Sequence, residues 1–125
     1  MAHVAFATLP VLDLDRAMAF WRDVMGAVVS MDAPYVGPSG TQARWVMMEI
    51  PGARTQIHLD PVDTMPVTDR PVLPLIVGDV AAEERRLLAL GVEILTPPTP
   101  APWDRDTIHA LIRDSEGATI LLASR

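Results

Sequence analysis

Two stretches of the chain follow the same order of predicted elements, and this internal repeat constrains the fold more than any other feature. In the first, a strand in FATLPVL precedes a helix in DLDRAMAFWRDVMG and strands in AVVSM, ARWVMMEI and TQIHLD. In the second, a strand in RPVLPLIVGD precedes a helix in VAAEERRLLALG and strands in VEILTPP, TIHALIRD and ATILLAS. Setting Asp13 against Asp79 superimposes the helix starts, and Gly26 and Gly91 at the helix ends then differ by one residue. We therefore predict an α+β fold with two tandem βαβββ modules, over about residues 3–63 and 70–125, in a single domain spanning residues 1–125.

The first helix is predicted to be amphipathic. Its N-terminal signal is Asp13 or Asp15, and five apolar side chains at helical spacing predict one buried face: Leu14, Ala17, Met18, Trp21 and Met25. Phe20 and Trp21 are predicted to belong to the core. The stretches APYVGPSG and TPPTPAPWD are predicted to be loops because of their proline and glycine content.

The charge and composition exclude several classes of function. The formal net charge of −6 disfavours nucleic acid as a partner, and it would attract a cationic small molecule. The chain has no cysteine, so disulfides, thiolate metal sites and cysteine nucleophiles are excluded. No apolar run approaches the ~20 residues that cross a bilayer, so no membrane partner is expected. The first residues lack the basic region of a secretory signal, which makes a cytoplasmic location the expectation.

The segments LPVLDLDRAMAFWRDVMG and RDSEGATILLAS, within tandem βαβββ units, resemble the vicinal oxygen chelate superfamily of glyoxalase I, extradiol dioxygenases and bleomycin resistance proteins. The segment PWDRDTIHALIRDSEG is most similar to the bleomycin-resistance branch, in which a Pro-Trp pair precedes the same strand. The closing hairpin resembles the D-P-x-G-N turn of the family, with Ser115 for proline and Ala118 for asparagine. The resemblance implies curled mixed sheets that form half-barrels around a cleft, with the helices outside. It also implies a homodimer in which strands of both chains enclose each cleft.

In metal-dependent relatives, four cleft-facing positions supply the metal ligands, on the first and last strand of each module. The resemblance places these positions at Phe6, His58, Val72 and Leu121. A divalent transition metal needs at least three nitrogen, oxygen or sulfur ligands, and only His58 can coordinate one. His109 lies on a strand that carries no ligand in these relatives. We therefore expect neither a metal site nor another cofactor.

The apolar side chains at these positions instead predict a hydrophobic cleft that binds a ligand. Phe6 and Leu121 would form its floor beside His58, and Tyr35 and Trp103 would lie in loops at its rim. Trp45 and Met47 share one face of their strand, whereas Val46, Met48 and Ile50 share the other. Alternation alone leaves open which of these two faces lines the cleft. The predicted ligand-binding residues are Phe6, Tyr35, Trp45, Met47, His58, Trp103 and Leu121.

Three functions are consistent with this pattern. The first is a metal-independent binding protein of the bleomycin-resistance type, which sequesters a planar or cationic natural product, such as an aromatic or glycopeptide antibiotic. Its context would be antibiotic resistance, transport or biosynthesis, and the sequence leaves open which. The second is a metal-independent, glyoxalase-like isomerase or lyase that uses His58, beside Asp60, as a base. The third is a scaffold without a small-molecule role. The sequence contains neither a nucleophile elbow around Ser39 nor a phosphate-binding glycine loop.

Overall fold

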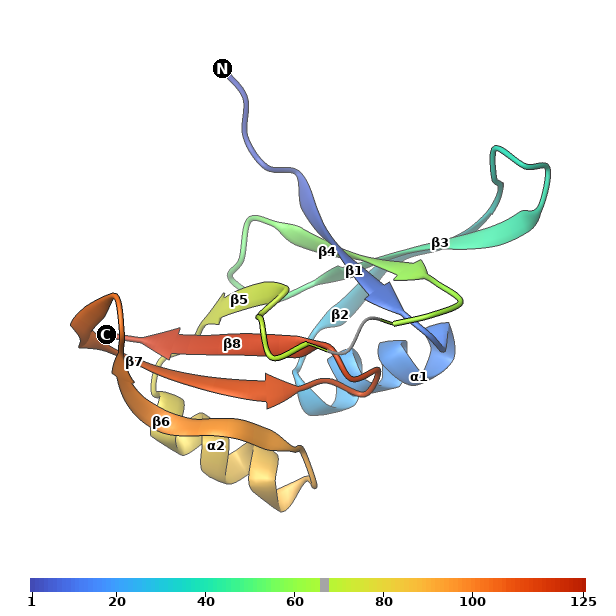
Figure 1. The fold of residues 1–125 in the computed structure, drawn as a ribbon. Helices are drawn as coiled ribbons and strands as arrows, with labels where there is room; N and C mark the ends of the chain where they lie inside the picture. The colour runs from blue at the N-terminus through green and yellow to red at the C-terminus, as the bar shows by residue number, and fades with distance from the viewer. Residues whose placement is uncertain (66–67) are drawn as a thin grey trace. The chain divides into compact units, whose positions relative to one another are not determined.

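The computed structural model describes residues 1–65 and 68–125 and contains two compact units, Met1–Thr64 and Met65–Arg125, called modules 1 and 2 below (Figure 1). The predicted α+β fold with two βαβββ modules is confirmed. Each module forms one four-stranded mixed sheet, and neither sheet closes into a barrel. In the part of the chain that the structure describes, no helix is long and apolar enough to cross a membrane.

Module 1 has the strand order β1-β4-β3-β2. Strands β1 and β4 run parallel, and the pairs β4–β3 and β3–β2 are antiparallel. Asp13 caps the first helix by accepting a hydrogen bond from the Arg16 backbone N–H at 3.0 Å, and Gly26, with a φ of 76°, follows its last turn. The elements are β1 (Phe6–Val11), α1 (Leu14–Ala19), the π-helical turn η1 (Phe20–Val24), β2 (Val28–Val36), β3 (Gln42–Glu49) and β4 (Gln56–Pro61).

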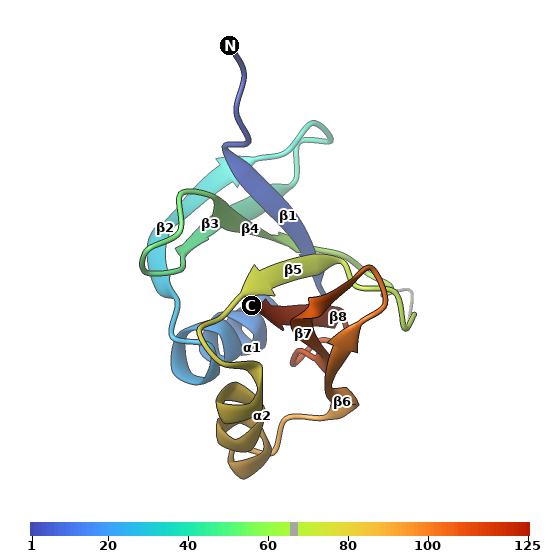
Figure 2. The same ribbon diagram turned by 90° about the vertical axis from the view of Figure 1, so that its left-hand side faces the viewer.

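Module 2 repeats this arrangement with the strand order β5-β8-β7-β6 (Figure 2). Strands β5 and β8 run parallel, and the other two pairs are antiparallel. Asp79 caps the helix as Asp13 does, by accepting a hydrogen bond from the Ala82 backbone N–H at 3.1 Å. The elements are β5 (Leu73–Ile76), α2 (Val80–Ala89), β6 (Ile94–Ala101), β7 (Asp104–Arg113) and β8 (Thr119–Ser124).

One face of each sheet packs against the helix of its own module. In module 1 the fully buried Trp21 and Ala17 project from the helical segment, as predicted, whereas Leu14, Met18 and Met25 are only half-buried. The strand residues on this side alternate along each strand, as a half-covered sheet requires. They are Leu9, Val11, Val46, Met48, Ile57 and Leu59 in module 1, and Leu73, Ala110, Ile112, Ile120 and Leu122 in module 2.

Half of the predicted loop APYVGPSG and most of the predicted loop TPPTPAPWD are strand, so these two predictions were wrong in part. Residues 33–36 belong to β2, and residues 96–101 belong to β6. Both strands are outermost in the strand order of their sheets, where proline is tolerated because its missing N–H can face away from the ladder. The pairing of β6 with β7 also shifts register around Thr96, Thr99 and Pro100. Tyr35 therefore lies on a strand, whereas Trp103 lies in the turn between β6 and β7 as predicted.

The closing hairpin forms its turn despite Ser115 and Ala118. One carboxylate oxygen of Asp114 accepts hydrogen bonds at 2.9 Å from the backbone N–H groups of Glu116 and Ala118. Gly117 supplies the positive φ, at 89°, that the turn requires. Burial of Asp114 raises the pKa of its carboxyl group, although these backbone hydrogen bonds act in the opposite direction. The aspartate and the glycine are thus sufficient for this turn.

Candidate functional site

The strand registers of module 1 place five of the predicted ligand-binding residues on the sheet face opposite the helix. Met47 pairs with His58 across β3 and β4, and Trp45 lies two residues along β3 on the same face. Phe6 lies two residues before Thr8, which pairs with His58. The pairing of β2 with β3 brings Tyr35 to the same side. We call this surface of Phe6, Tyr35, Trp45, Met47 and His58 the aromatic face.

The rings of the aromatic face form one connected cluster. The imidazole of His58 stacks on the indole of Trp45, with centroids 3.8 Å apart and planes inclined by 17°. The Phe6 ring meets both of these rings edge-on, with its centroid 6.1 Å from that of Trp45 and 5.7 Å from that of His58. The Tyr35 ring, on β2, also meets Trp45 edge-on, with ring centroids 5.7 Å apart. Phe6 and Tyr35 are each 39% exposed, so they present aromatic surface outward, and Trp45 contacts both rings.

His58 supplies the imidazole of this cluster, and its surroundings favour the neutral form of that ring. The side chain is 6% exposed, and this burial lowers its pKa, while the nearby Asp60 carboxylate acts weakly in the opposite direction. The Thr8 hydroxyl lies 3.5 Å from Nδ1, at the limit of a hydrogen bond. Within the described residues, Nε2 has no hydrogen-bond partner. A neutral imidazole can therefore offer Nε2 to a polar group of a ligand.

We predict that acidification destabilises the protein through His58. Because its pKa is lower in the folded state, the unfolded chain binds more protons below the ordinary histidine pKa of about 6.5. Its contribution to stability is therefore complete above that pH and is lost as the pH falls toward the pKa of the folded state. Denaturant titrations between about pH 7.5 and pH 5 should show that the free energy of unfolding falls less for His58→Gln than for the wild type. His3→Gln, at an exposed histidine, is the control, and the same reduction in both variants would contradict the prediction.

The other two predicted site residues belong to module 2. Leu121 pairs with Pro74 and Leu111 on the sheet face opposite the buried Ile120 and Leu122. Trp103 is 60% exposed, and its indole contacts the imidazole of His109 with centroids 5.3 Å apart. The Nδ1 of His109 lies 3.2 Å from the Thr99 carbonyl oxygen, which orients this ring. Module 2 thus carries a second, smaller group of apolar and aromatic side chains.

Sequence reasoning missed three neighbours of the aromatic face on the same side of the sheet. Thr8 lies beside His58, and strand alternation from Phe6 could have identified it. Met31 and Ala33 lie opposite Met47 and Trp45 on β2. A register shift between Val29 and Met31 changes which side chains of β2 face this side, and no residue pattern indicates it.

The residues at the metal-binding positions of the resembled relatives do not fit a metal ion. Phe6, Val72 and Leu121 carry hydrocarbon side chains, which leaves His58 as a single donor. Across residues 1–65 and 68–125, no three histidine, aspartate or glutamate side chains gather closely enough to hold a metal. We therefore assign no metal-dependent chemistry to this site.

We predict that a strong chelator leaves the melting temperature of the purified protein unchanged. A structural metal would bind the folded state in preference to the unfolded one and would raise stability, so its removal would lower the melting temperature. Elemental analysis should find less than one transition-metal ion per chain. One zinc, nickel or iron per chain, together with a chelator-sensitive melt, would contradict the prediction.

The family model of the Glyoxalase/Bleomycin resistance protein/Dioxygenase superfamily matches residues 1–122. The chain belongs to this superfamily. The family model covers both modules, in agreement with the resemblance of the helix entry and the closing hairpin. A search of curated protein sequences returned no significant match.

Solved structures of the superfamily share the fold over nearly the whole chain. TnmS3, an antibiotic binding protein from Streptomyces sp. CB03234, is 31% identical, with a TM-score of 0.79 over 99% of this chain and 96% of its own. A glyoxalase/bleomycin resistance protein from the same organism is also 31% identical, with a TM-score of 0.72 over 96% of this chain and 98% of its own. A superfamily member from Sphaerobacter thermophilus DSM 20745 is 24% identical and shows the fold alone, with a TM-score of 0.81 over 100% of this chain and 98% of its own.

Proposed function

We propose that this protein is a metal-independent binding protein that sequesters a planar natural product without altering it. The aromatic face carries the proposal. Two of the four positions at which metal-dependent superfamily members bind an ion, Phe6 and His58, belong to this ring cluster, and the Phe6 side chain cannot coordinate a metal. Aromatic and methionine surfaces bind flat ring systems through apolar burial and offset or edge-on ring contacts. The similarity to TnmS3, described as an antibiotic binding protein, supports the same class of ligand.

The proposed site combines an apolar surface with one directional group. Phe6 and Tyr35 present exposed ring surface, and Met47 lies beside His58 on the same face. The neutral His58 would donate or accept one hydrogen bond through Nε2, which would orient the ligand. Trp103 and Leu121, which belong to module 2, remain predicted ligand-binding residues. The net charge of −6 would increase the local concentration of a cationic ligand, so the ligand class includes planar cations.

A thermal-shift screen with aromatic and glycopeptide antibiotics tests the proposal. A ligand present at 100 times its dissociation constant adds about 2.7 kcal/mol to the free energy of unfolding. Mass spectrometry after prolonged incubation should recover that ligand unchanged. Failure of every aromatic compound to raise the melting temperature, with binding of a non-aromatic one, would contradict the proposed ligand class.

A metal-independent isomerase or lyase is the second candidate, and the lowered pKa of His58 favours it. A general base must be unprotonated at the working pH, and burial provides this at His58. This reaction would convert the ligand during the incubation above, and His58→Gln would abolish the conversion while the ligand still binds. A product that forms with wild-type protein and not with His58→Gln would replace our first proposal with this one.

The superfamily resemblance also implies a homodimer, which remains a prediction. Light scattering should give about twice the 13.6 kDa mass of one chain. A mass of one chain that stays constant on concentration would contradict it.

A further inference from the structure

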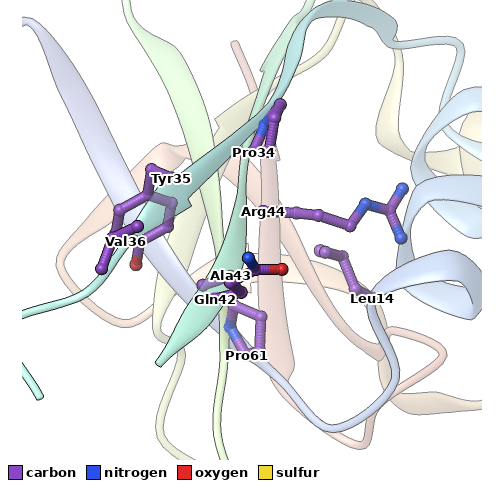
Figure 3. A pocket seen from close by; sticks show the side chains of 8 residues that line it. All are labelled: Leu14, Pro34, Tyr35, Val36, Gln42, Ala43, Arg44 and Pro61. Atoms are coloured by element: carbon purple, nitrogen blue, oxygen red, sulfur yellow. The ribbon is translucent and has the colours of Figure 1, made fainter. Parts of the chain in front are cut away.

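Module 1 has a concave region at the start of β3, which shares only Tyr35 with the aromatic face. It has a volume of about 620 Å³. Figure 3 shows that Arg44 and Tyr35 point to opposite sides of the sheet. Side chains from both faces of β3 therefore line one cavity, which means that the cavity reaches this strand at its edge. The lining residues are Leu14, Pro34, Tyr35, Val36, Gln42, Ala43, Arg44 and Pro61.

The edge of β3 that borders this cavity is unpaired. Strand β3 pairs with β4 only at Val46, Met47 and Met48, while β4 continues along β1 as far as Pro61. The residues 42–45 therefore have β2 on one side and no strand on the other, and Figure 1 shows the β2–β3 ribbon extending beyond β4. In the described part of the chain, no other backbone segment is hydrogen-bonded there. Pro61, across the cavity, has no N–H with which to close the ladder.

The polar groups of this edge are those that an extended peptide pairs with. Alternate residues of an unpaired strand direct their backbone N–H and C=O groups outward, and peptides bind such edges by adding a strand. Four residues of β3 span about 13 Å in the extended conformation. A cavity of about 620 Å³ is within the size range of small-ligand sites, so it suits a ligand of a few residues and not a folded domain.

Arg44, the one charged side chain among the lining residues, is paired with two carboxylates beside the cavity. The Arg44 guanidinium donates hydrogen bonds to Asp32 at 2.8 and 3.1 Å and to Asp15 at 2.9 Å. Two carboxylates thus surround one guanidinium, which leaves a local excess of negative charge. The walls formed by Leu14, Val36 and Pro61 would accept apolar groups of the same ligand.

We propose that the edge of β3 at residues 42–45 is a second binding site, which takes a short, extended, cationic peptide. The ligand adds a strand to β3, places apolar groups against Leu14 and Pro61, and directs its positive charge toward Asp15 and Asp32. A second copy of the chain is a poorer occupant, because it would bring a further net charge of −6 to this acidic edge. The site does not depend on the function proposed for the aromatic face.

The experiment uses the full chain labelled with ¹⁵N and the capped peptide Ac-Val-Lys-Val-Lys-NH₂. Addition of the peptide at millimolar concentration should shift the amide resonances of Gln42, Ala43 and Arg44 and slow hydrogen exchange at those that face the cavity. A peptide of the same sequence, N-methylated at alternate residues so that it cannot donate to the edge, should bind about tenfold more weakly or worse. The resonances of β7 in module 2 serve as the unperturbed reference.

Two matched variants test the charge component. Asp15 and Asp23 are both paired with an arginine and lie in the same helical segment, but only Asp15 contacts a residue that lines the cavity. Asp15→Asn should weaken peptide binding about threefold, which is the usual contribution of an exposed ion pair. Asp23→Asn should leave peptide binding unchanged.

Three results would overturn the proposal. The first is the absence of amide shifts at residues 42–44 on addition of the peptide, and the second is equal binding of the peptide and its N-methylated form. The third is that the resonances of residues 42–44 shift with protein concentration in the absence of peptide, which would identify a second copy of the chain as the occupant. Shifts confined to Phe6 and His58 would also reject the edge site while leaving the aromatic face intact. Failure of the antibiotic screen, in contrast, would reject the proposed function without affecting the result at the β3 edge.

Discussion

Trp21→Ala is expected to lower the free energy of unfolding by about 3–5 kcal/mol, the usual cost of deleting a large aromatic side chain from a core. Trp21 is 0% exposed and lies in η1, where its ring also contacts Phe20 with centroids 5.8 Å apart. Removing it leaves a cavity that the surrounding strand residues can fill only in part. The melting temperature should fall by roughly 10 °C or more.

Two substitutions calibrate this result. Trp21→Phe should cost much less than Trp21→Ala, because the indole N–H has no hydrogen-bond partner in the described residues and little polar interaction is lost. Trp103→Ala removes an indole that is 60% exposed and should change stability by about 1 kcal/mol or less. Equal losses for Trp21→Ala and Trp103→Ala in denaturant titrations would show that our assignment of the core is wrong.

Trp45→Ala is expected to weaken binding of the planar ligand by about 2 kcal/mol or more, which corresponds to roughly 30-fold in the dissociation constant. The reason is the position of Trp45 within the ring cluster. It contacts His58, Phe6 and Tyr35, so its loss removes the support of every other ring of the aromatic face. Calorimetric titration with the compound found in the screen measures the effect.

Met48→Ala is the control for Trp45→Ala, because Met48 is fully buried on the opposite face of β3. It should lower the melting temperature by opening a cavity and leave the dissociation constant of the folded protein unchanged. Trp103→Ala should weaken ligand binding by about 1–3 kcal/mol, the range for losing one stacking ring. Normal binding by Trp45→Ala, together with a large loss in Met48→Ala, would mean that the ligand lies on the helix side of the sheet.

Local sequence signals predicted those features of the fold that depend on a few neighbouring residues. Asp13 and Asp79 cap their helices because a carboxylate at this position satisfies a free backbone N–H whatever the rest of the chain does. Trp21 is buried because helical periodicity places it on the apolar stripe. The repeat of these signals was sufficient to predict two βαβββ modules.

Strand pairing decided what the local pattern left open. Trp45 and Met47 alternate with Val46 and Met48, and both pairs are apolar, so hydrophobicity could not distinguish the two faces of β3. The register of β3 with β4 does so, because it places Met47 beside His58 and leaves Val46 and Met48 buried on the helix side. The aromatic face is thus a consequence of register, which depends on residues far apart in the chain.

The prolines near Tyr35 and Thr99 show the same division between local and tertiary information. Locally they indicate loops, because proline cannot donate a ladder hydrogen bond. In the tertiary structure both segments occupy the outermost strands of their sheets, where that donor is not required. By itself the sequence determined the helices, their caps and the repeat. It also determined that the four residues at the metal positions, His58 and three hydrocarbon side chains, do not suit a metal ion. Only the tertiary structure decided which side chains share a face and where β3 is left unpaired, because both depend on how distant strands align.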